Sequence, residues 1–142
     1  MLTPEQLRQV KDAGAQFAVS PGITERLLTA ARGLEVALLP GVASASEVQL
    51  ALECGYARLK FFPAEAAGGP AVLQALYGPF PQVRFCPTSG ITARSAPAYL
   101  KLPNVACVGG SWLAPKALMD KGDGPALAAL AQDSRSLEGV TP

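Results

Sequence analysis

Lys60 lies in an apolar and aromatic segment, residues 58–65, where a lysine could carry out covalent chemistry. A charged amine is costly to bury without a partner. Desolvation beside Phe61 and Phe62 would lower the pKa of the amine, and a neutral amine is a nucleophile. The alternative interpretation is an ammonium that reaches solvent at a strand end or sits in a structural ion pair.

The segment around Lys60 is predicted to be a buried strand that ends at Pro63. Successive side chains of a strand point to opposite faces. Lys60 and Phe62 should therefore share one face, and Leu59 and Phe61 the other.

Length and composition favour a single domain over residues 1–142. Apolar residues make up 49% of the chain and charged residues 16%, which is ample for a core. The net charge is +1 and the basic residues are scattered, so neither nucleic acid nor an anionic membrane is an expected partner. No apolar stretch is long enough to span a bilayer, and the first residues do not form a signal peptide.

The chain contains no histidine and only three isolated cysteines, Cys54, Cys86 and Cys107. An odd cysteine count without a C-x-x-C pair argues against a disulfide framework or zinc site, and it fits a reduced cytoplasm. We therefore expect no metal. Any acid–base chemistry must come from Glu, Asp, Lys, Tyr, Cys or water.

A repeat of apolar strand, Pro/Gly corner and helix runs along the chain. The predicted strands cover 16–20, 35–39, 57–62, 82–86 and 105–108. The predicted helices run from Thr3-Pro4 to Gly14, over 24–32, 44–55, about 70–77 and 95–100, and onward from Pro115 with a break at 122–124. The polar end, 132–142, is predicted to fray. The corner residues Pro21, Pro40, Pro63, Pro87 and Gly110 are 19, 23, 24 and 23 positions apart.

This repeat predicts an α/β fold with parallel strands and helices packed outside them. Ligands of such folds bind at the carboxyl ends of the strands, which is where the corner after Lys60 lies. Five strands are too few for an eight-stranded barrel. Two architectures remain: an open five-stranded sheet, or an incomplete (β/α)8 barrel whose uncovered edges would invite association or instability.

Two small-residue corners, Thr88-Ser89-Gly90 and Gly109-Gly110-Ser111, close the last two predicted strands. Small residues let backbone N–H groups approach an anion, and barrels often bind phosphate with their last two loops. As a pair, the corners predict a phosphate site. Each alone would be interpreted as a tight turn.

Other candidates favour ordinary structural roles. Glu65 is the carboxylate nearest to Lys60 along the chain, and a solvated loop position is the simpler interpretation. Trp112 is predicted to pack in the core. Ser20-Pro21-Gly22 and Pro40-Gly41 are turns that could also wall a substrate pocket.

Residues 13–22, 59–65, 83–88 and 109–112 together resemble 2-keto-3-deoxy-6-phosphogluconate (KDPG/KHG) aldolase. The resemblance covers nearly the whole chain and weakens in the final helix. It implies a cytoplasmic class I aldolase of the Entner–Doudoroff route, on a TIM barrel, typically homotrimeric and without cofactor or metal. The implied reaction cleaves KDPG, a 2-keto acid phosphate, to pyruvate and glyceraldehyde 3-phosphate.

The resemblance also implies roles for individual residues. Lys60 matches the Schiff-base lysine and Phe62 an aromatic of the pocket wall. Pro21 matches a residue whose backbone borders the substrate, and Thr88 one near the pyruvyl carboxylate. The residues that match the phosphate loops are Ser89, Gly90, Gly110 and Ser111.

The chain departs from the family pattern in two ways. Ser89 stands where the family usually has the first glycine of P-T-G-G-I. The three strand–helix units that hold the family's general acid/base glutamate, an arginine and a G-A-G-T motif have no match, so we expect an N-terminally truncated or mis-started chain with impaired catalysis. Two alternatives are a non-catalytic phosphosugar- or phosphate-binding fragment, and a polypeptide that acts after pairing with a chain that supplies the strands.

Overall fold

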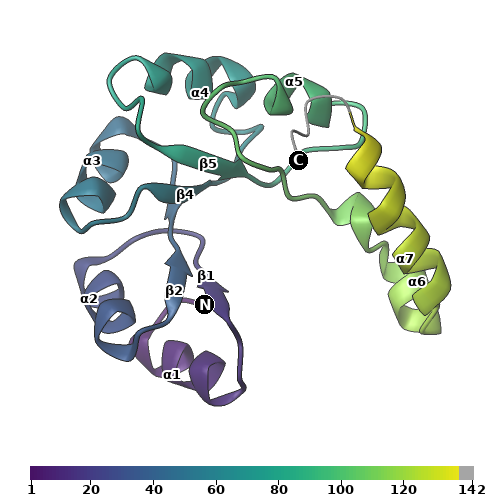
Figure 1. Ribbon diagram of the computed structural model, residues 1–142, viewed down its shortest axis with the longest axis horizontal. Helices are drawn as coiled ribbons and strands as arrows, with labels where there is room; N and C mark the ends of the chain where they lie inside the picture. Colours follow the sequence, from purple (N-terminus) through teal and green to yellow (C-terminus); the bar gives the residue numbers. More distant parts are fainter. Residues whose placement is uncertain (138–142) are drawn as a thin grey trace.

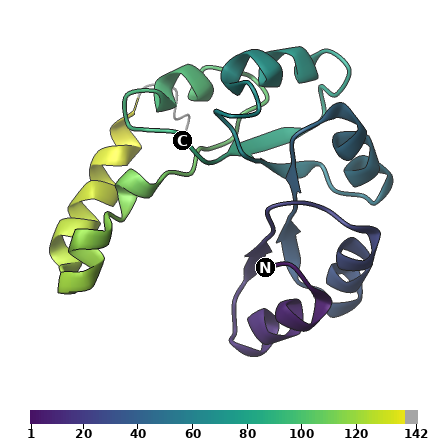
Figure 2. The same cartoon turned by 180° about the vertical axis from the view of Figure 1, so that it is seen from behind.

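The computed structural model describes residues 1–137. Its strands are β1 (Phe17–Val19), β2 (Ala37–Leu39), β3 (Gly41–Val42), β4 (Arg58–Phe61) and β5 (Arg84–Pro87). Its helices are α1 (Pro4–Asp12), α2 (Glu25–Leu34), α3 (Ala45–Glu53), α4 (Gly69–Tyr77), α5 (Ala96–Leu100), α6 (Lys116–Lys121) and α7 (Gly124–Asp133), with short 3₁₀ turns at Ser111–Leu113 and Ser134–Ser136. The strands line the inside of an arc and α1 to α5 lie along its outside (Figures 1 and 2).

All strand pairs are parallel. β1 pairs with β2, and β3, β4 and β5 form a second set in that order. The described residues form an open arc of about five strand positions rather than a closed barrel. The predicted parallel α/β fold and incomplete barrel are therefore confirmed.

The second predicted strand was expected to end at Pro40-Gly41, and this was wrong. The chain stays extended through Pro40 and pairs again as β3. Proline has no N–H, so it interrupts the ladder, but the Pro40 carbonyl accepts a bond from Lys60 N at 2.8 Å. The strand thus keeps its place beside β4.

The predicted strand 105–108 forms one isolated bridge, Phe85 with Val105, and Gly109 just after it forms a second with Thr88. From Phe85 to Thr88 the chain advances three positions, but from Val105 to Gly109 it advances four. The segment 105–109 therefore contains one extra residue. An extra residue disrupts the ladder locally, as in a β-bulge. The segment still lies next to β5, because Gly109 N donates to Pro87 O at 3.0 Å.

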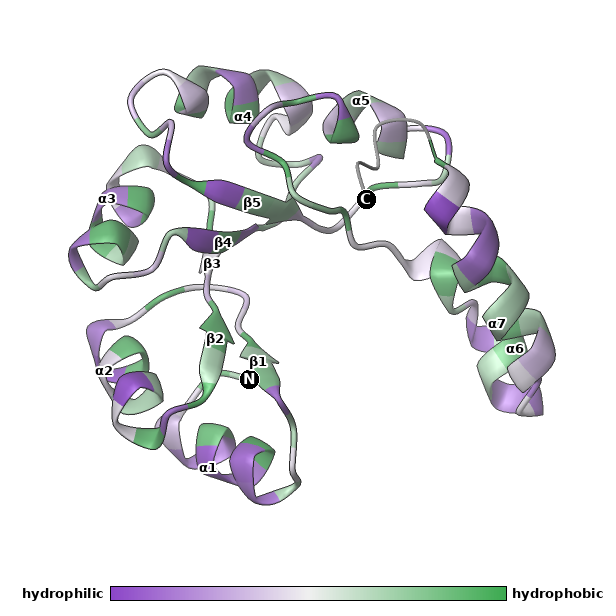
Figure 3. Ribbon diagram, viewed as in Figure 1, coloured by the Kyte–Doolittle hydropathy of each residue, from purple (hydrophilic) through white to green (hydrophobic). Residues whose placement is uncertain are grey.

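The core lies between the sheet and the outer helices. One cluster of buried side chains contains Leu59, Phe61 and Phe85 from β4 and β5, and a smaller one contains Ala18 and Leu38 from β1 and β2. The hydrophobic colouring of β1 and β2 contrasts with the polar segments of β4 and β5 (Figure 3). The exposed first residues of β4 and β5 are Arg58 and Arg84, whereas those of β1 and β2 are the apolar Phe17 and Ala37, which accounts for the contrast.

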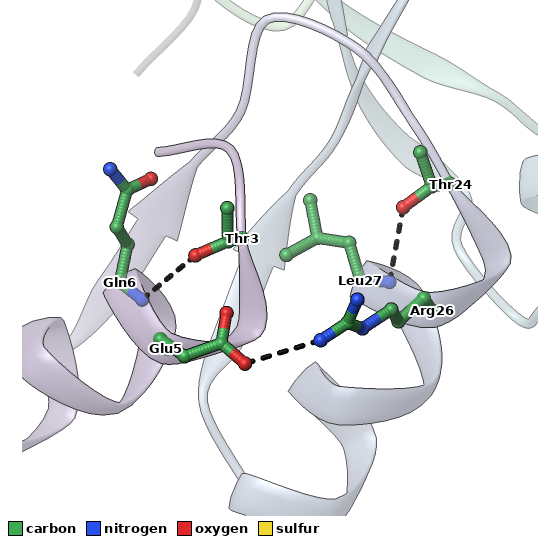
Figure 4. A network of polar contacts seen from close by, with 6 residues as sticks. All are labelled: Thr3, Glu5, Gln6, Thr24, Arg26 and Leu27. Carbon is green, nitrogen blue, oxygen red and sulfur yellow. Dashed lines mark hydrogen bonds and ion pairs between the residues drawn. The ribbon is translucent and has the colours of Figure 1, made fainter.

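Helices α1 and α2 begin with matching caps, pack in one apolar cluster and are joined by an ion pair (Figure 4). Thr3 Oγ1 accepts from Gln6 N, and Thr24 Oγ1 accepts from Leu27 N at 3.2 Å. Such caps satisfy N–H groups that a helix start leaves without partners. Arg26 lies 3.2 Å from Glu5, and both side chains are largely exposed.

The C-terminal helices α6 and α7 project away from the sheet (Figure 1). The predicted break between them is confirmed, because Gly122 ends α6 with φ at 64°. Within the segment predicted to fray, α7 and the following 3₁₀ turn continue to Ser136; residues 138–142 lie outside the described part. Across residues 1–137, no helix has the length and apolar character needed to cross a membrane.

Candidate active site

Lys60 lies on the inner face of the sheet, on β4 between β3 and β5. Its register partners are Gly41 and Cys86. Its Nζ lies 4.3 Å from the centre of the Phe62 ring, as a cation–π contact. Both side chains are half-buried, so the predicted shared face of Lys60 and Phe62 is confirmed.

Phe61 does not shield the amine. It is fully buried in the core on the opposite face, where its ring meets Phe85 edge-on. The aromatic surface against Lys60 therefore comes from Phe62. The Lys60 residue as a whole is only partly buried.

The corner that contains Pro21 lies beside Gly41, the residue paired with Lys60 on the neighbouring strand. Ser20 is buried, its N–H donates to Leu39 O at 3.2 Å, and its hydroxyl donates to Gly22 O at 2.8 Å. The Pro21 carbonyl lies so close to Gly41 that any side chain there would overlap it. Because Gly41 is the register partner of Lys60, Pro21 is brought to the strand next to the lysine.

Thr88, Ser89 and Gly90 form the loop after β5, directly beside the end of β4. Thr88 N donates to Phe61 O at 3.0 Å, which continues the β4–β5 ladder. Ser89 and Gly90 have φ of 85° and 78°, so the serine adopts the conformation that a glycine would favour. The departure at Ser89 thus preserves the loop's left-handed backbone.

The hydroxyl of Thr88 is buried and has no hydrogen-bond partner within residues 1–137. A buried polar group without a partner costs on the order of 1–3 kcal/mol. Because Oγ1 has almost no exposed surface, an acceptor from a substrate recovers that free energy only where the loop moves to admit it. This unsatisfied donor sits at a position predicted to bind substrate.

Gly109, Gly110 and Ser111 lie next to the Thr88 loop through the Thr88–Gly109 bridge. A side chain at Gly109 would come within 2.7 Å of the Thr88 methyl group, and one at Gly110 would overlap the Trp112 ring. The absence of Cβ atoms therefore permits this approach. Trp112 packs against the main core, as predicted.

Two cysteines, Cys86 and Cys107, lie close to each other at the site of Lys60, and their interaction was not expected from the sequence. Cys86 is beside Lys60 in register, and its thiol and that of Cys107 are close enough for a thiol–thiolate hydrogen bond to shift both pKa values. This hydrogen bond, opposed by burial, lowers the pKa of Cys107 to about 7. The same interaction, with burial, raises the pKa of Cys86. Cys86 stands two residues before Thr88, and Cys107 stands two residues before Gly109. Because Thr88 and Gly109 form a bridge, this equal spacing was the available sequence signal.

The structure brings together most of the predicted site. Lys60, Phe62 and the two small-residue loops lie at one end of adjacent strands, with Pro21 two strand positions away. Glu65 is exposed at the same end, but its carboxylate is held by Tyr99, whose hydroxyl donates to Oε1 at 2.7 Å. Within residues 1–137 no group of three or more metal-ligating side chains is placed to hold a metal ion.

The sequence model described as KDPG and KHG aldolase matches residues 1–130. The 2-dehydro-3-deoxy-phosphogluconate aldolase of Pseudomonas aeruginosa is 54% identical over 123 residues, which is 87% of this chain and 56% of that protein. The KHG/KDPG aldolase of Escherichia coli is 49% identical over 134 residues, 94% of this chain and 63% of that protein.

Two solved structures are similar over nearly the whole chain. KDPG aldolase from Legionella pneumophila, with pyruvate captured at low pH as a covalent carbinolamine intermediate, superposes with a TM-score of 0.89 at 47% identity over 96% of this chain and 65% of that one. The Zymomonas mobilis enzyme with 3-phosphoglycerate gives 0.88 at 43% identity, over 99% of this chain and 66% of that one.

The chain thus spans 56% to 63% of the length of these two curated relatives. The family match covers far more than half of the chain itself. The lysine strand and the two loops that carried the resemblance are also assembled side by side. The chain belongs to the KDPG and KHG aldolase family.

Proposed function

We propose that this chain functions as a class I aldolase, a lyase that cleaves KDPG to pyruvate and glyceraldehyde 3-phosphate. The observation that carries the proposal is the Lys60 amine held against Phe62 beside two small-residue loops. A relative with 47% identity captures pyruvate covalently as a carbinolamine. Because the chain spans less than two thirds of its curated relatives, the activity of this length of chain is itself part of the proposal.

Lys60 is the proposed nucleophile. Its neutral amine attacks the C2 carbonyl of the keto acid, and loss of water gives an imine that is protonated on nitrogen. The protonated imine accepts the electron pair of the C3–C4 bond as the C4 hydroxyl loses its proton and the aldehyde leaves. The enamine that remains takes a proton at C3, and water then releases pyruvate and the free amine.

Phe62, Pro21 and Thr88 are the proposed pocket residues for the pyruvyl end. The Phe62 ring lies against the amine, and it would exclude water from one side of the imine. The Thr88 hydroxyl, which lacks a partner, would donate to the substrate carboxylate. The Pro21 backbone, which lies against Gly41 of the neighbouring strand β3, would border the substrate from that side.

Ser89, Gly90, Gly110 and Ser111 are the proposed phosphate-binding residues. Successive backbone N–H groups in αR–αL or turn conformations form concave anion sites, and Ser89 and Gly90 lie in a bend with positive φ. The Zymomonas mobilis relative was solved with 3-phosphoglycerate, a phosphorylated three-carbon acid. Two loops of this kind would hold the phosphate end while Lys60 reacts at the keto end.

The second candidate function is binding of phosphorylated ligands without turnover. It is favoured by Glu65, the carboxylate nearest to Lys60 along the chain, because its Oε1 is already engaged by the Tyr99 hydroxyl. General acid–base assistance is worth roughly 10²–10⁴-fold in rate. A chain without such a group would still form the imine and bind phosphate.

Turnover assays separate the two candidates. The full chain is incubated with KDPG, and released pyruvate is measured with lactate dehydrogenase, alongside Lys60→Ala. Pyruvate release that requires Lys60 supports the aldolase. Phosphate binding with no pyruvate release above the variant supports the binding function and rejects turnover by this chain.

We further propose a cytoplasmic homo-oligomer, with a trimer expected by resemblance. The inner sheet face supports self-association, because Phe17 is 63% exposed there. The three cysteines are free, which fits a reducing compartment. Light scattering of the purified chain would give its oligomeric state, and a monomer at all concentrations would reject the trimer.

A further inference from the structure

Tyr99 is a buried polar residue for which the proposed reaction has no use. It lies on α5 and is completely buried in the main core. Its hydroxyl lies at the edge of the core and donates a hydrogen bond to Glu65 Oε1 at 2.7 Å. Burial, followed by the hydrogen bond and charge of Glu65, raises the pKa of Tyr99, so the hydroxyl stays a donor at neutral pH. The bond therefore ties the outer helix to the loop after β4.

Glu65 in turn contacts the loop that follows β5. Its N–H donates to Ser89 O at 3.2 Å, one residue after Ala64 N donates to Thr88 O at 2.8 Å. Its side-chain stem lies over Gly90, where a Cβ would come within 2.6 Å of Glu65 Cγ and 2.7 Å of its Cβ. Glu65 thus covers the loop with its stem while its carboxylate is held on the other side by Tyr99.

We propose that Tyr99 and Glu65 are positioning residues that hold the loop of residues 88–90 in its anion-binding conformation. The inference rests on the phosphate end of the proposed function. Gly90 and Ser89 both have positive φ, and a serine in that region needs support from its surroundings. The stem of Glu65 supplies that support only while Tyr99 fixes the direction of its carboxylate.

This role differs from proton transfer in what it requires of Glu65. A positioning role needs an oxygen that accepts from Tyr99 and a stem of the same length. Glutamine provides both, whereas a general base needs the carboxylate itself. Glu65→Gln should therefore behave like the natural chain, and Glu65→Ala should not.

The test measures two ends of the site separately in the full chain. Inorganic phosphate affinity is measured by titration calorimetry, and imine formation by borohydride trapping of pyruvate on Lys60. Tyr99→Phe and Glu65→Ala should weaken phosphate affinity by about tenfold, the scale of one lost hydrogen bond to a charged group, while trapping changes by less than about twofold. Tyr77→Phe, an exposed tyrosine, is the matched control and should change neither.

The outcomes distinguish this inference from the proposed function. Phosphate affinity that is equal in Glu65→Ala and the natural chain overturns the inference, and so does a loss in Glu65→Gln as large as in Glu65→Ala. Absence of phosphate binding by the natural chain also overturns it. Absence of a pyruvate adduct, with the expected phosphate pattern, rejects the proposed aldolase and leaves the positioning role supported. Should Tyr99→Phe fail to fold, the two exposed Glu65 variants decide.

Discussion

Lys60 reaches its site through β4, and the face it occupies follows from strand alternation. The neighbouring residues in the sequence predicted aromatic rings beside the Lys60 amine, and the Phe62 ring lies against it. The pairing with Cys86 could not be predicted, because register between strands depends on the turns and core that join them. For the same reason the Tyr99–Glu65 bond, between residues 34 positions apart, left no local sequence signal.

The first prediction concerns the thiol of Cys107, whose pKa is lowered to about 7 by the Cys86 hydrogen bond. Its alkylation by iodoacetamide should reach half-maximal rate near pH 7 in the folded chain, against about 8.5 for an ordinary thiol in denaturant. Between these values the folded state binds fewer protons. The contribution of Cys107 to stability is therefore present above the unfolded value and lost as pH falls through 7.

Substitution of the donor tests the cause of this shift. Cys86→Ala should move the alkylation midpoint of Cys107 upward, because the thiolate loses its hydrogen bond. Cys54→Ala is the matched control and should leave the midpoint in place. A midpoint that is unchanged in Cys86→Ala would contradict the assigned cause.

At the scale of elements, the helices were the more predictable part. Capping residues such as Thr3, Thr24 and Ser44 act on the backbone within one turn, so their sequence signals are local. The Ser44–Glu47 capping box is present in both directions. The strand ends were less predictable. Pro40 interrupts a hydrogen-bond ladder without ending the strand, whereas the extra residue in 105–109 disrupts the ladder beside β5.

The second prediction compares two contacts at the start of α2. Thr24→Ala removes the oxygen that accepts from Leu27 N and should lower the free energy of unfolding by about 1 kcal/mol. Arg26→Ala removes an exposed ion pair with Glu5 and should cost less than about 0.5 kcal/mol. Urea midpoints of the two variants check this. Equal losses in both would mean that the cap is not the stronger contact.

At the scale of the whole molecule, the repeat predicted the parallel order and the open arc but not the division of the core. The main cluster, under β4 and β5, contains 14 buried residues, and the cluster under β1 and β2 contains 7. Ile23 and Tyr56 pack against both. The cluster to which a side chain belongs depends on the distances between helices. The sequence of a single helix or strand does not determine those distances.

The third prediction follows from this division. Local opening is governed by the apolar contacts that hold a segment. The amides of β4 and β5 should therefore resist hydrogen exchange longer than those of β1 and β2. Exchange followed by peptide mass spectrometry compares peptides over 17–19 and 37–39 with those over 58–61 and 84–87. Equal protection would show that the two clusters open as one unit.

The central claim is that the amine of Lys60 condenses with a 2-keto acid, and borohydride trapping tests it most directly. The full chain is incubated with pyruvate, reduced, digested and mapped by mass spectrometry, with Lys60→Arg as the control that keeps the positive charge. The account predicts one reduced pyruvyl group on Lys60 and none in the variant. No adduct, or an adduct spread over exposed lysines such as Lys11 and Lys116 to the same extent, would contradict it.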